Sequence, residues 1–185
     1  MIKLVLSDMD NTLVPFGARH ASPRTMEAIH AVLDAGVRFG PDTGRDYVEL
    51  MRFFRMDEEC FMTGIFSNGK RVRADGAYVQ TTLIDHDVLV RLDEVLRPEP
   101  GMFLVCYPAE TNLFNPAYGV GVSSAELAVF EARTSFVGGT VDEVPDIDFV
   151  AATIACLGGP ERMERCRAIV AEAVPEVRIV SPIPE

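Results

Sequence analysis

The chain has 185 residues, of which 48% are hydrophobic, so it can bury a substantial core as one large domain or two small ones. Its 28 acidic and 17 basic residues give a formal net charge of -11, which argues against nucleic acid or an anionic membrane surface as the main partner. A local phosphate site is compatible with this charge, because a metal ion and backbone amides can hold an anion.

The four cysteines are typical of reduced thiols in a hydrophobic core. They contain no CxxC pair and lie among apolar residues. No segment approaches the length of a membrane span, and the apolar run before Asp8 is too short for a signal peptide. We therefore expect a protein of the reducing cytoplasm. The cysteines are Cys60, Cys106, Cys156 and Cys166.

The apolar run at the start of the chain predicts a buried strand that ends on two carboxylates. Asp8 and Asp10 alternate with Met9, so both acids point the same way while Met9 turns back toward the core. A buried parallel strand tolerates carboxylates only where it emerges, at the carboxyl edge where open α/β sheets place their ligands. This layout, followed by Thr12, indicates chemistry on phosphate.

The following segments alternate between helix and strand. Ser22 and Pro23 form the N-cap and first turn of a helix that Gly36 closes, and helical spacing resumes at residues 48–54. This order predicts parallel strands joined by right-handed crossovers, so the polar loops after the strands share one edge. The predicted strands and hairpin arms are residues 1–7, 36–41, 60–66, 71–73 and 77–79.

The pattern restarts near residue 80, which predicts two domains, 1–79 and 80–185, of which the second is also α/β. Its helices are marked by a capping box of Ser123 with Glu126 and by a helix-opening Pro160. The predicted elements are a helix at 86–96, a strand at 102–107, a helix from Ser123 to about 133, a strand at 149–157, a helix from Pro160 and a strand at 177–180.

Phosphoryl transfer needs an in-line nucleophile, a proton donor for the leaving oxygen, and positive charge or amide donors on the equatorial oxygens. Asp8 and Asp10 can fill the first two roles only if their protonation states differ. A phosphate dianion that approaches two carboxylates is repelled unless a cation intervenes. This interpretation therefore requires Mg²⁺.

These motifs resemble those of a known family. DMDNT resembles the DxDxT signature of the haloacid dehalogenase superfamily, DTGR resembles its second motif, and SNG resembles a phosphate-proximal turn of the Cof-like, subclass IIB sugar phosphatases. The resemblance is strong over residues 1–79 and looser beyond. It implies an α/β fold in which a Rossmann-like parallel-sheet core, here incomplete, carries an inserted α/β cap over residues 80–185.

The resemblance also implies roles for single residues. Asp8 would be the nucleophile that forms a phosphoaspartyl intermediate, and Asp10 would act as acid and then base. Mg²⁺ would be held by the side chain of Asp8 and the backbone carbonyl of Asp10. Thr43, with nearby amides, would clamp the phosphate, and Thr12 would orient the loop. The implied phosphate-binding residues are Asp8, Met9, Asp10, Thr12, Thr43, Gly44 and Asn68.

Several of the neighbouring residues have two interpretations. Arg45 is either a substrate or loop anchor, or a surface charge at a helix end. Asn68 either hydrogen-bonds the phosphate region or Asp10, or shapes a turn with Gly69. Asn11 stands where many relatives carry glycine, and asparagine accepts unusual backbone angles. Ordinary surface roles are expected for the three histidines, His20, His30 and His86.

Two motifs of the resembled family are missing. Lys3 and Lys70 do not stand where its charge-offsetting lysine is expected, and its acidic metal-binding cluster is not matched by the loop carboxylates Asp142, Glu143, Asp146 and Asp148. The sequence therefore resembles the front of a capped hydrolase without its last third. A sheet reduced in this way leaves an apolar edge and face, so we expect a homo-oligomer or a compensating rearrangement.

The sequence favours a phosphoric monoester hydrolase that acts on a small phosphorylated metabolite such as a sugar phosphate. The alternatives are a catalytically impaired remnant that binds a ligand or protein, and a phosphotransferase such as a phosphomutase. A receiver domain is disfavoured, because Ser67-Asn68-Gly69 stands where its phosphoacceptor aspartate belongs. The polar candidates for substrate contact in the second domain are Asn112, Asn115 and Tyr118.

Overall fold

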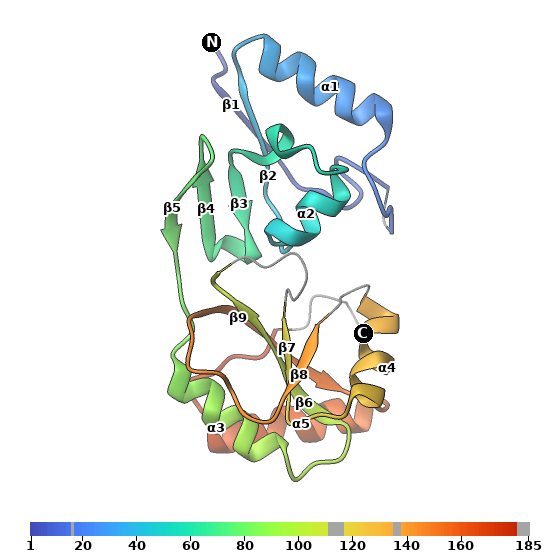
Figure 1. Ribbon diagram of the computed structural model, residues 1–185, viewed down its shortest axis with the longest axis vertical. Helices are drawn as coiled ribbons and strands as arrows, with labels where there is room; N and C mark the ends of the chain where they lie inside the picture. Colours follow the sequence, from blue (N-terminus) through green and yellow to red (C-terminus); the bar gives the residue numbers. More distant parts are fainter. Residues whose placement is uncertain (16, 111–116, 135–137, 181–185) are drawn as a thin grey trace. The chain divides into compact units, whose positions relative to one another are not determined.

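A computed structural model describes residues 1–15, 17–110, 117–134 and 138–180, with the side chains of 132–134 left out. The chain is a mixed α/β protein with two compact units, Met1–Thr82 and Leu83–Glu185 (Figure 1). Each unit has its own hydrophobic core. None of the helices in the described ranges is long and apolar enough to cross a membrane.

The first unit begins with the predicted parallel strands. β1 (Leu4–Ser7) pairs with β2 (Arg38–Pro41) in parallel, and α1 (Pro23–Asp34) connects them. After β2, a parallel bridge joins Asp42 to Ile65 in β3 (Gly64–Phe66). The carboxyl ends of the three strands therefore lie at one edge, as the order of elements predicts.

The helix between the two strands begins and ends where the sequence indicates. Ser22 Oγ accepts the backbone N–H of Thr25 at 3.1 Å, and Pro23 occupies the first helical turn. The C-cap is Ala35, and Gly36 follows with φ 74°, a left-handed conformation that glycine adopts without steric cost. Local chemistry thus fixes the length of α1, and Ile29 anchors it in the core.

The prediction of a strand at residues 60–66 is wrong for the first half of that range. Residues Glu58–Phe61 form the 3₁₀ helix η1, and the strand covers only Gly64–Phe66. Asp57 caps η1 by accepting the N–H of Glu59 at 3.3 Å. Cys60 and Phe61 are fully buried, so the apolar run belongs to the core without being a strand. Short apolar runs do not distinguish the two structures.

The prediction that the first strand is buried is also wrong. Leu4 and Leu6 retain 44% and 41% of their accessible surface, and residues on both faces of β1 are at most half-buried. Within the described ranges β1 has β2 as its only strand neighbour, so its other edge is open. An open, apolar strand edge favours pairing with another segment or chain.

A predicted hairpin completes the first unit. β4 (Arg71–Ala74) pairs antiparallel with β3 and with β5 (Ala77–Thr81), as Figure 1 shows. Asp75 and Gly76 form the turn with φ values of 50° and 87°, the positive angles that a tight hairpin turn requires. Before β3, the predicted helix is α2 (Tyr47–Phe53).

The second unit is a four-stranded sheet with helices on both faces. The strands lie in the order β8 (Gly139–Val141), β7 (Tyr118–Val120), β6 (Met102–Pro108) and β9 (Phe149–Cys156). Along β6, Leu104 and Cys106 pack in one cluster with α3 (His86–Leu96) and α5 (Pro160–Ala173). Phe103 and Val105 pack in another with α4 (Ser124–Thr134), on the opposite face.

Most predicted elements of this unit are present. The helix at His86–Leu96 agrees with the prediction, and Ser123 and Glu126 form the predicted capping box. The strand predicted at residues 177–180 is wrong, because these residues pair with no other strand in the described part of the chain. Val177 and Ile179 nevertheless pack against the core. β7 and β8 were not predicted, and they are only three residues long each. Asn112 and Asn115 lie outside the described residues.

Burial keeps the thiols protonated and predicts their reactivity. It raises the pKa of Cys60 and Cys106 to about 12 and that of Cys166 to about 11. We expect iodoacetamide at pH 8 to leave these three unmodified in the native protein and to alkylate them in urea, as the intact mass will show. Half-buried Cys156 should react first. Rapid native alkylation of Cys106 would contradict this burial.

Candidate active site

Backbone hydrogen bonds tie together the three loops that follow β1, β2 and β3. Asp42 N–H donates to the carbonyl of Ser7 at 2.9 Å, which joins the first two strand ends. Thr43 N–H donates to Ile65 O at 2.9 Å, and Asn68 N–H donates to Thr43 O at 3.1 Å. The loops carrying the DxDxT, DTGR and SNG sequences therefore meet at one edge.

The first loop is a tight turn closed on the carbonyl of Met9. This oxygen accepts the N–H groups of Leu13 at 3.0 Å and Val14 at 2.9 Å. The Met9 side chain is fully buried in the core, as the alternation predicts. Asn11 has φ 61°, and its N–H donates to Val14 O at 2.7 Å, so asparagine occupies a left-handed position here.

Asp8 is held at the surface by the threonine of its own motif. Thr12 Oγ1 donates to Asp8 Oδ2 at 3.2 Å, and the Asp8 side chain is exposed. One carboxylate oxygen is thereby oriented by the turn. This contact leaves the carboxylate of Asp8 accessible to a ligand.

Arg45 lies over the first loop and binds Asp10. Its Nη2 donates to Asp10 Oδ1 at 3.1 Å, while its Nη1 lies 3.5 Å from Met9 Sδ. The guanidinium stacks over the Phe53 ring, 5.2 Å from the ring centroid. Only 23% of the Arg45 side chain is exposed. Of the two interpretations, this geometry favours the anchor over the surface charge.

Thr43 and Gly44 form the centre of the second loop. Thr43 is buried, and its Oγ1 accepts the N–H of Arg45 at 3.2 Å, which leaves the hydroxyl hydrogen to donate to a ligand. A Cβ on Gly44 would lie 3.0 Å from Asn68 Oδ1. Asn68 itself is left-handed, with φ 54°, so it shapes the turn and also packs against the Thr43-Gly44 segment.

A buried ion pair supports the second loop, and the sequence analysis missed it. Arg71 Nη1 donates to both oxygens of Asp46, at 3.1 and 3.0 Å, and only 2% of the Arg71 side chain is exposed. Asp46 also accepts Tyr47 N–H and forms a capping box with Glu49 at the start of α2. The spacing of Asp46 and Glu49 indicates the capping box, but no local pattern indicates the ion pair with Arg71.

Two ionisable groups beside these loops have shifted pKa values. Burial raises the pKa of the Glu49 carboxyl, which accepts the N–H of Asp46 at 3.2 Å. Burial also lowers the pKa of the Lys70 side chain. The backbone N–H of the same residue donates to the carbonyl oxygen of Ser67 in the third loop, at 3.3 Å. The loops are thus set in a partly desolvated surface, where charged contacts are stronger than in water.

Removing the carboxylate of Asp46 should destabilise the first unit. We expect Asp46→Ala to lower the free energy of unfolding by about 2 to 3 kcal/mol, because Arg71 loses this buried partner and α2 loses its cap. Urea denaturation measures the change. The control is Asp75→Asn, because the ion pair of Asp75 with Arg38 is exposed and should contribute nothing measurable, while asparagine tolerates the left-handed backbone of this turn position. Equal effects of the two substitutions would contradict the prediction.

Comparison with known proteins gives a consistent picture. The sequence profile of the family described as haloacid dehalogenase-like hydrolase matches residues 5–180. A hypothetical protein from Geobacillus kaustophilus HTA426 is similar, with TM-score 0.75, 21% identity, and coverage of 98% of this chain and 66% of that one. A haloacid dehalogenase-like hydrolase from Bacteroides thetaiotaomicron has TM-score 0.74, 18% identity, and coverage of 99% and 68%.

A subclass IIB sugar phosphatase of the haloacid dehalogenase superfamily, BT4131, is also similar, with TM-score 0.61, 16% identity, and coverage of 94% of this chain and 64% of that one. At these identities the likeness shows a shared fold. The chain spans 64–66% of the length of the first solved structures that it matches. A search of curated proteins finds no match.

Proposed function

The chain belongs to the haloacid dehalogenase-like hydrolases, and we propose that it is a Mg²⁺-dependent phosphatase of small phosphorylated metabolites. The observation that carries the proposal is the edge where Asp8 and Asp10 meet the Thr43 loop, with Met9 buried beneath them. In this proposal residues 1–79 are the front of the catalytic core and residues 80–185 are the cap.

The proposed reaction has two steps. In the first, a carboxylate oxygen of Asp8 attacks phosphorus, the bond from phosphorus to the leaving oxygen breaks, and Asp10 donates a proton to that oxygen. In the second, Asp10 takes a proton from water, which attacks the phosphoaspartyl group and releases phosphate and free Asp8. The Thr43 hydroxyl and the Gly44 amide donate to the phosphate oxygens, and Asn68 closes the turn beside them.

The residues present fit a magnesium ion. The Asp8 carboxylate and the Asp10 backbone carbonyl are hard oxygen donors, and Mg²⁺ is commonly bound by one or two carboxylates together with phosphate and water oxygens. When bound, the ion neutralises phosphate charge and so lowers the repulsion between the substrate and the two carboxylates. Thr12 keeps the Asp8 carboxylate oriented, and Arg45 does the same for Asp10.

A sugar phosphate is the substrate class that we propose. The support is the similarity to the subclass IIB sugar phosphatase, together with a second unit that would serve as a cap. A cap of this kind covers the leaving group and so selects it. Tyr118, one of the predicted contact residues, lies in β7 and packs against the core of that unit, which makes it a weaker candidate than a loop residue.

Hydrolysis of an aryl phosphate such as p-nitrophenyl phosphate tests the function directly. We expect release of phosphate by the 185-residue chain with Mg²⁺, and its loss when EDTA removes the ion. Equal turnover by wild type and by the Asp8→Asn variant would defeat the proposal.

The exposed first strand favours a second candidate function. Leu4 and Leu6 present apolar surface on one face of a strand whose second edge is unpaired within the described residues, as expected of a module that is completed by another chain. In that case the chain would bind a phosphorylated ligand or a protein with little turnover of its own. Robust Mg²⁺-dependent hydrolysis by the purified chain would exclude this candidate. A phosphotransferase would instead pass the phosphoryl group to an added acceptor alcohol.

A further inference from the structure

A second group of metal-ligating side chains lies in the first unit and shares no residue with the proposed active site. His30 projects from α1, Asp57 precedes η1, and Cys60 lies within η1. One ligand atom from each of the three lies within 4.8 Å of the others. The sequence predicted an ordinary surface role for His30. The structure places it against one segment, residues 57–60, that begins 27 residues further along the chain.

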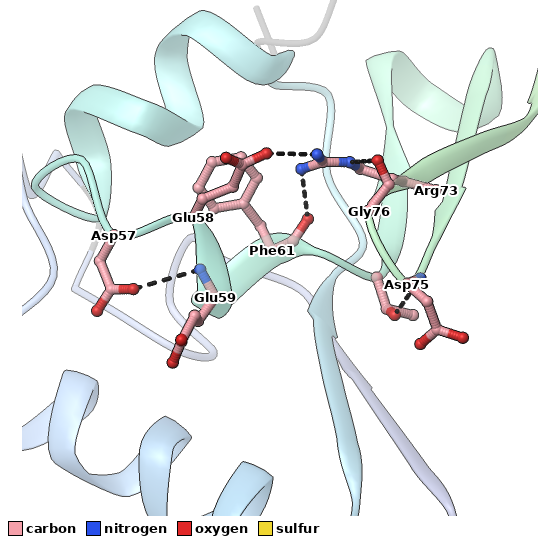
Figure 2. Close-up of polar contacts among 8 residues, drawn as sticks. Asp57, Glu58, Glu59, Phe61, Arg73, Asp75 and Gly76 are labelled. Atoms are coloured by element: carbon pink, nitrogen blue, oxygen red, sulfur yellow. Dashed lines mark hydrogen bonds and ion pairs between the residues drawn. The ribbon is translucent and has the colours of Figure 1, made fainter.

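Figure 2 shows how consecutive acids of this segment separate. Glu58 turns toward Arg73, with which it forms an ion pair at the edge of the hairpin. Asp57 and Glu59 lie on the other side of the segment, away from Arg73. The backbone N–H of Glu59 donates to Asp57 Oδ1 at 3.3 Å, and this hydrogen bond holds the conformation. Asp57 Oδ2 is left to contact His30.

The imidazole of His30 has a carboxylate at each of its nitrogens. Nε2 lies 2.7 Å from Asp57 Oδ2, and Nδ1 lies 3.7 Å from Glu59 Oε2. The contact at Nε2 is a hydrogen bond, whereas Glu59 Oε2 lies beyond hydrogen-bond distance from Nδ1, on a side chain that is 70% exposed. A metal ion on Nε2 would take the place of the hydrogen between Nε2 and Asp57, with the Nδ1 hydrogen directed toward Glu59.

Cys60 adds the donor that selects the kind of ion. Its side chain is fully buried, and its Sγ lies 4.0 Å from Met26 Sδ. His30 and Asp57 are half-buried, with 37% and 29% of their side chains exposed, so an ion could enter from solvent. A set of nitrogen, sulfur and one carboxylate oxygen suits Zn²⁺, whereas Mg²⁺ prefers oxygen alone.

We propose that His30, Asp57 and Cys60 bind Zn²⁺, with water as the fourth ligand and Glu59 as the acceptor for the other imidazole nitrogen. On binding, zinc bonds to the cysteine sulfur as the thiol proton leaves to solvent. The site joins α1 to the segment that leads into β3, and β3 ends at the Asn68 turn. Zinc would therefore stabilise the unit that carries the active site without taking part in the reaction.

Titration of the reduced 185-residue chain with Co²⁺ tests the site, because cobalt replaces zinc and reports thiolate ligation by an ultraviolet charge-transfer band. We expect a band that saturates at one equivalent, is abolished by Zn²⁺, and persists in the Asp8→Asn variant. We also expect Zn²⁺ to raise the Tm of the chain, since it binds only the folded state. A titration without this band, or with a band that depends on Asp8, would overturn the proposal.

Single substitutions separate this site from adventitious binding. Cys60→Ser should abolish the band, and His30→Gln should weaken Zn²⁺ binding by about 100-fold or more, whereas Glu59→Gln should weaken it by about 10- to 100-fold. The control is Cys106→Ser, which changes a buried thiol of the other unit and should keep the band. Because His30 is half-exposed, its variant should fold even if Cys60→Ser does not. Unchanged zinc affinity in His30→Gln would refute the site.

Discussion

Asp8→Asn is expected to abolish phosphatase turnover, with a fall of about 10⁴-fold or more relative to wild type, the scale for loss of a covalent nucleophile. The amide keeps the size of the carboxylate and can still accept the hydrogen bond from Thr12, so the loop should keep its shape. It has neither the charge nor the nucleophilicity to attack phosphorus. Initial rates of aryl phosphate hydrolysis with Mg²⁺ measure the change.

The matched control is Asp34→Asn, which removes one exposed carboxylate at the end of α1 and should leave the rate unchanged. It separates the chemistry of Asp8 from a general effect of reducing the net charge. Thermal unfolding of both variants should match that of wild type. A large loss of stability in Asp8→Asn would make its lost turnover a folding effect and would remove the support for a nucleophile.

Asp10→Asn distinguishes the two proposed carboxylate roles. An activated aryl leaving group needs little protonation, so the first step should survive in part, whereas release of the phosphoryl group from Asp8 should stall without a base. We expect a burst of p-nitrophenol followed by very slow turnover. A steady rate equal to that of wild type would exclude Asp10 from both proton transfers.

Gly40→Ala is expected to have the largest effect on folding, with a loss of about 4 kcal/mol or more. Gly40 lies in β2, where a Cβ would stand 1.9 Å from Thr63 O and 2.9 Å from Gly64 Cα. These are backbone atoms at the start of β3, so no side-chain rotation relieves the overlap. The alanine must push β3 from β2, and the Thr43 and Asn68 loops would separate with them.

Far-UV circular dichroism and urea denaturation measure this effect, and the expected result is a chain that is largely unfolded or insoluble at 25 °C. The control is Gly159→Ser, at the N-cap of α5, where a Cβ meets nothing within 4 Å and serine is a preferred cap. It should fold as wild type. A Gly40→Ala protein of normal stability would show that β2 and β3 do not approach so closely.

Local signals were enough to predict much of the first unit. The N-cap at Ser22 and the hairpin turn at Asp75 depend on contacts within a few residues, so sequence alone locates them. Met9 is buried as predicted, but it lies in the turn after β1, so the strand period that motivated the prediction does not extend to it. The 3₁₀ helix at Glu58–Phe61 escaped prediction, because a short apolar run has no period that separates it from a strand.

The chemical groups of the candidate site can be identified from the sequence: two acids after a strand, followed by a threonine-glycine loop and an asparagine turn on the next two strands. The contacts that hold those groups come from tertiary packing, which brings Arg45 to Asp10 and Arg71 to Asp46. The partners in each pair are 35 and 25 residues apart. No local pattern encodes such pairs, because the packing of whole elements brings them together.

Tertiary packing also determines which of the segments are buried and which are exposed. The apolar composition of the first strand implied burial, yet burial depends on what packs against a strand, and β1 has a single strand neighbour among the described residues. In the same way, the sequence predicts an ordinary surface role for His30, and the fold places Asp57 and Cys60 beside it. Composition sets what a segment can bury, and the neighbours that the fold supplies decide whether it does.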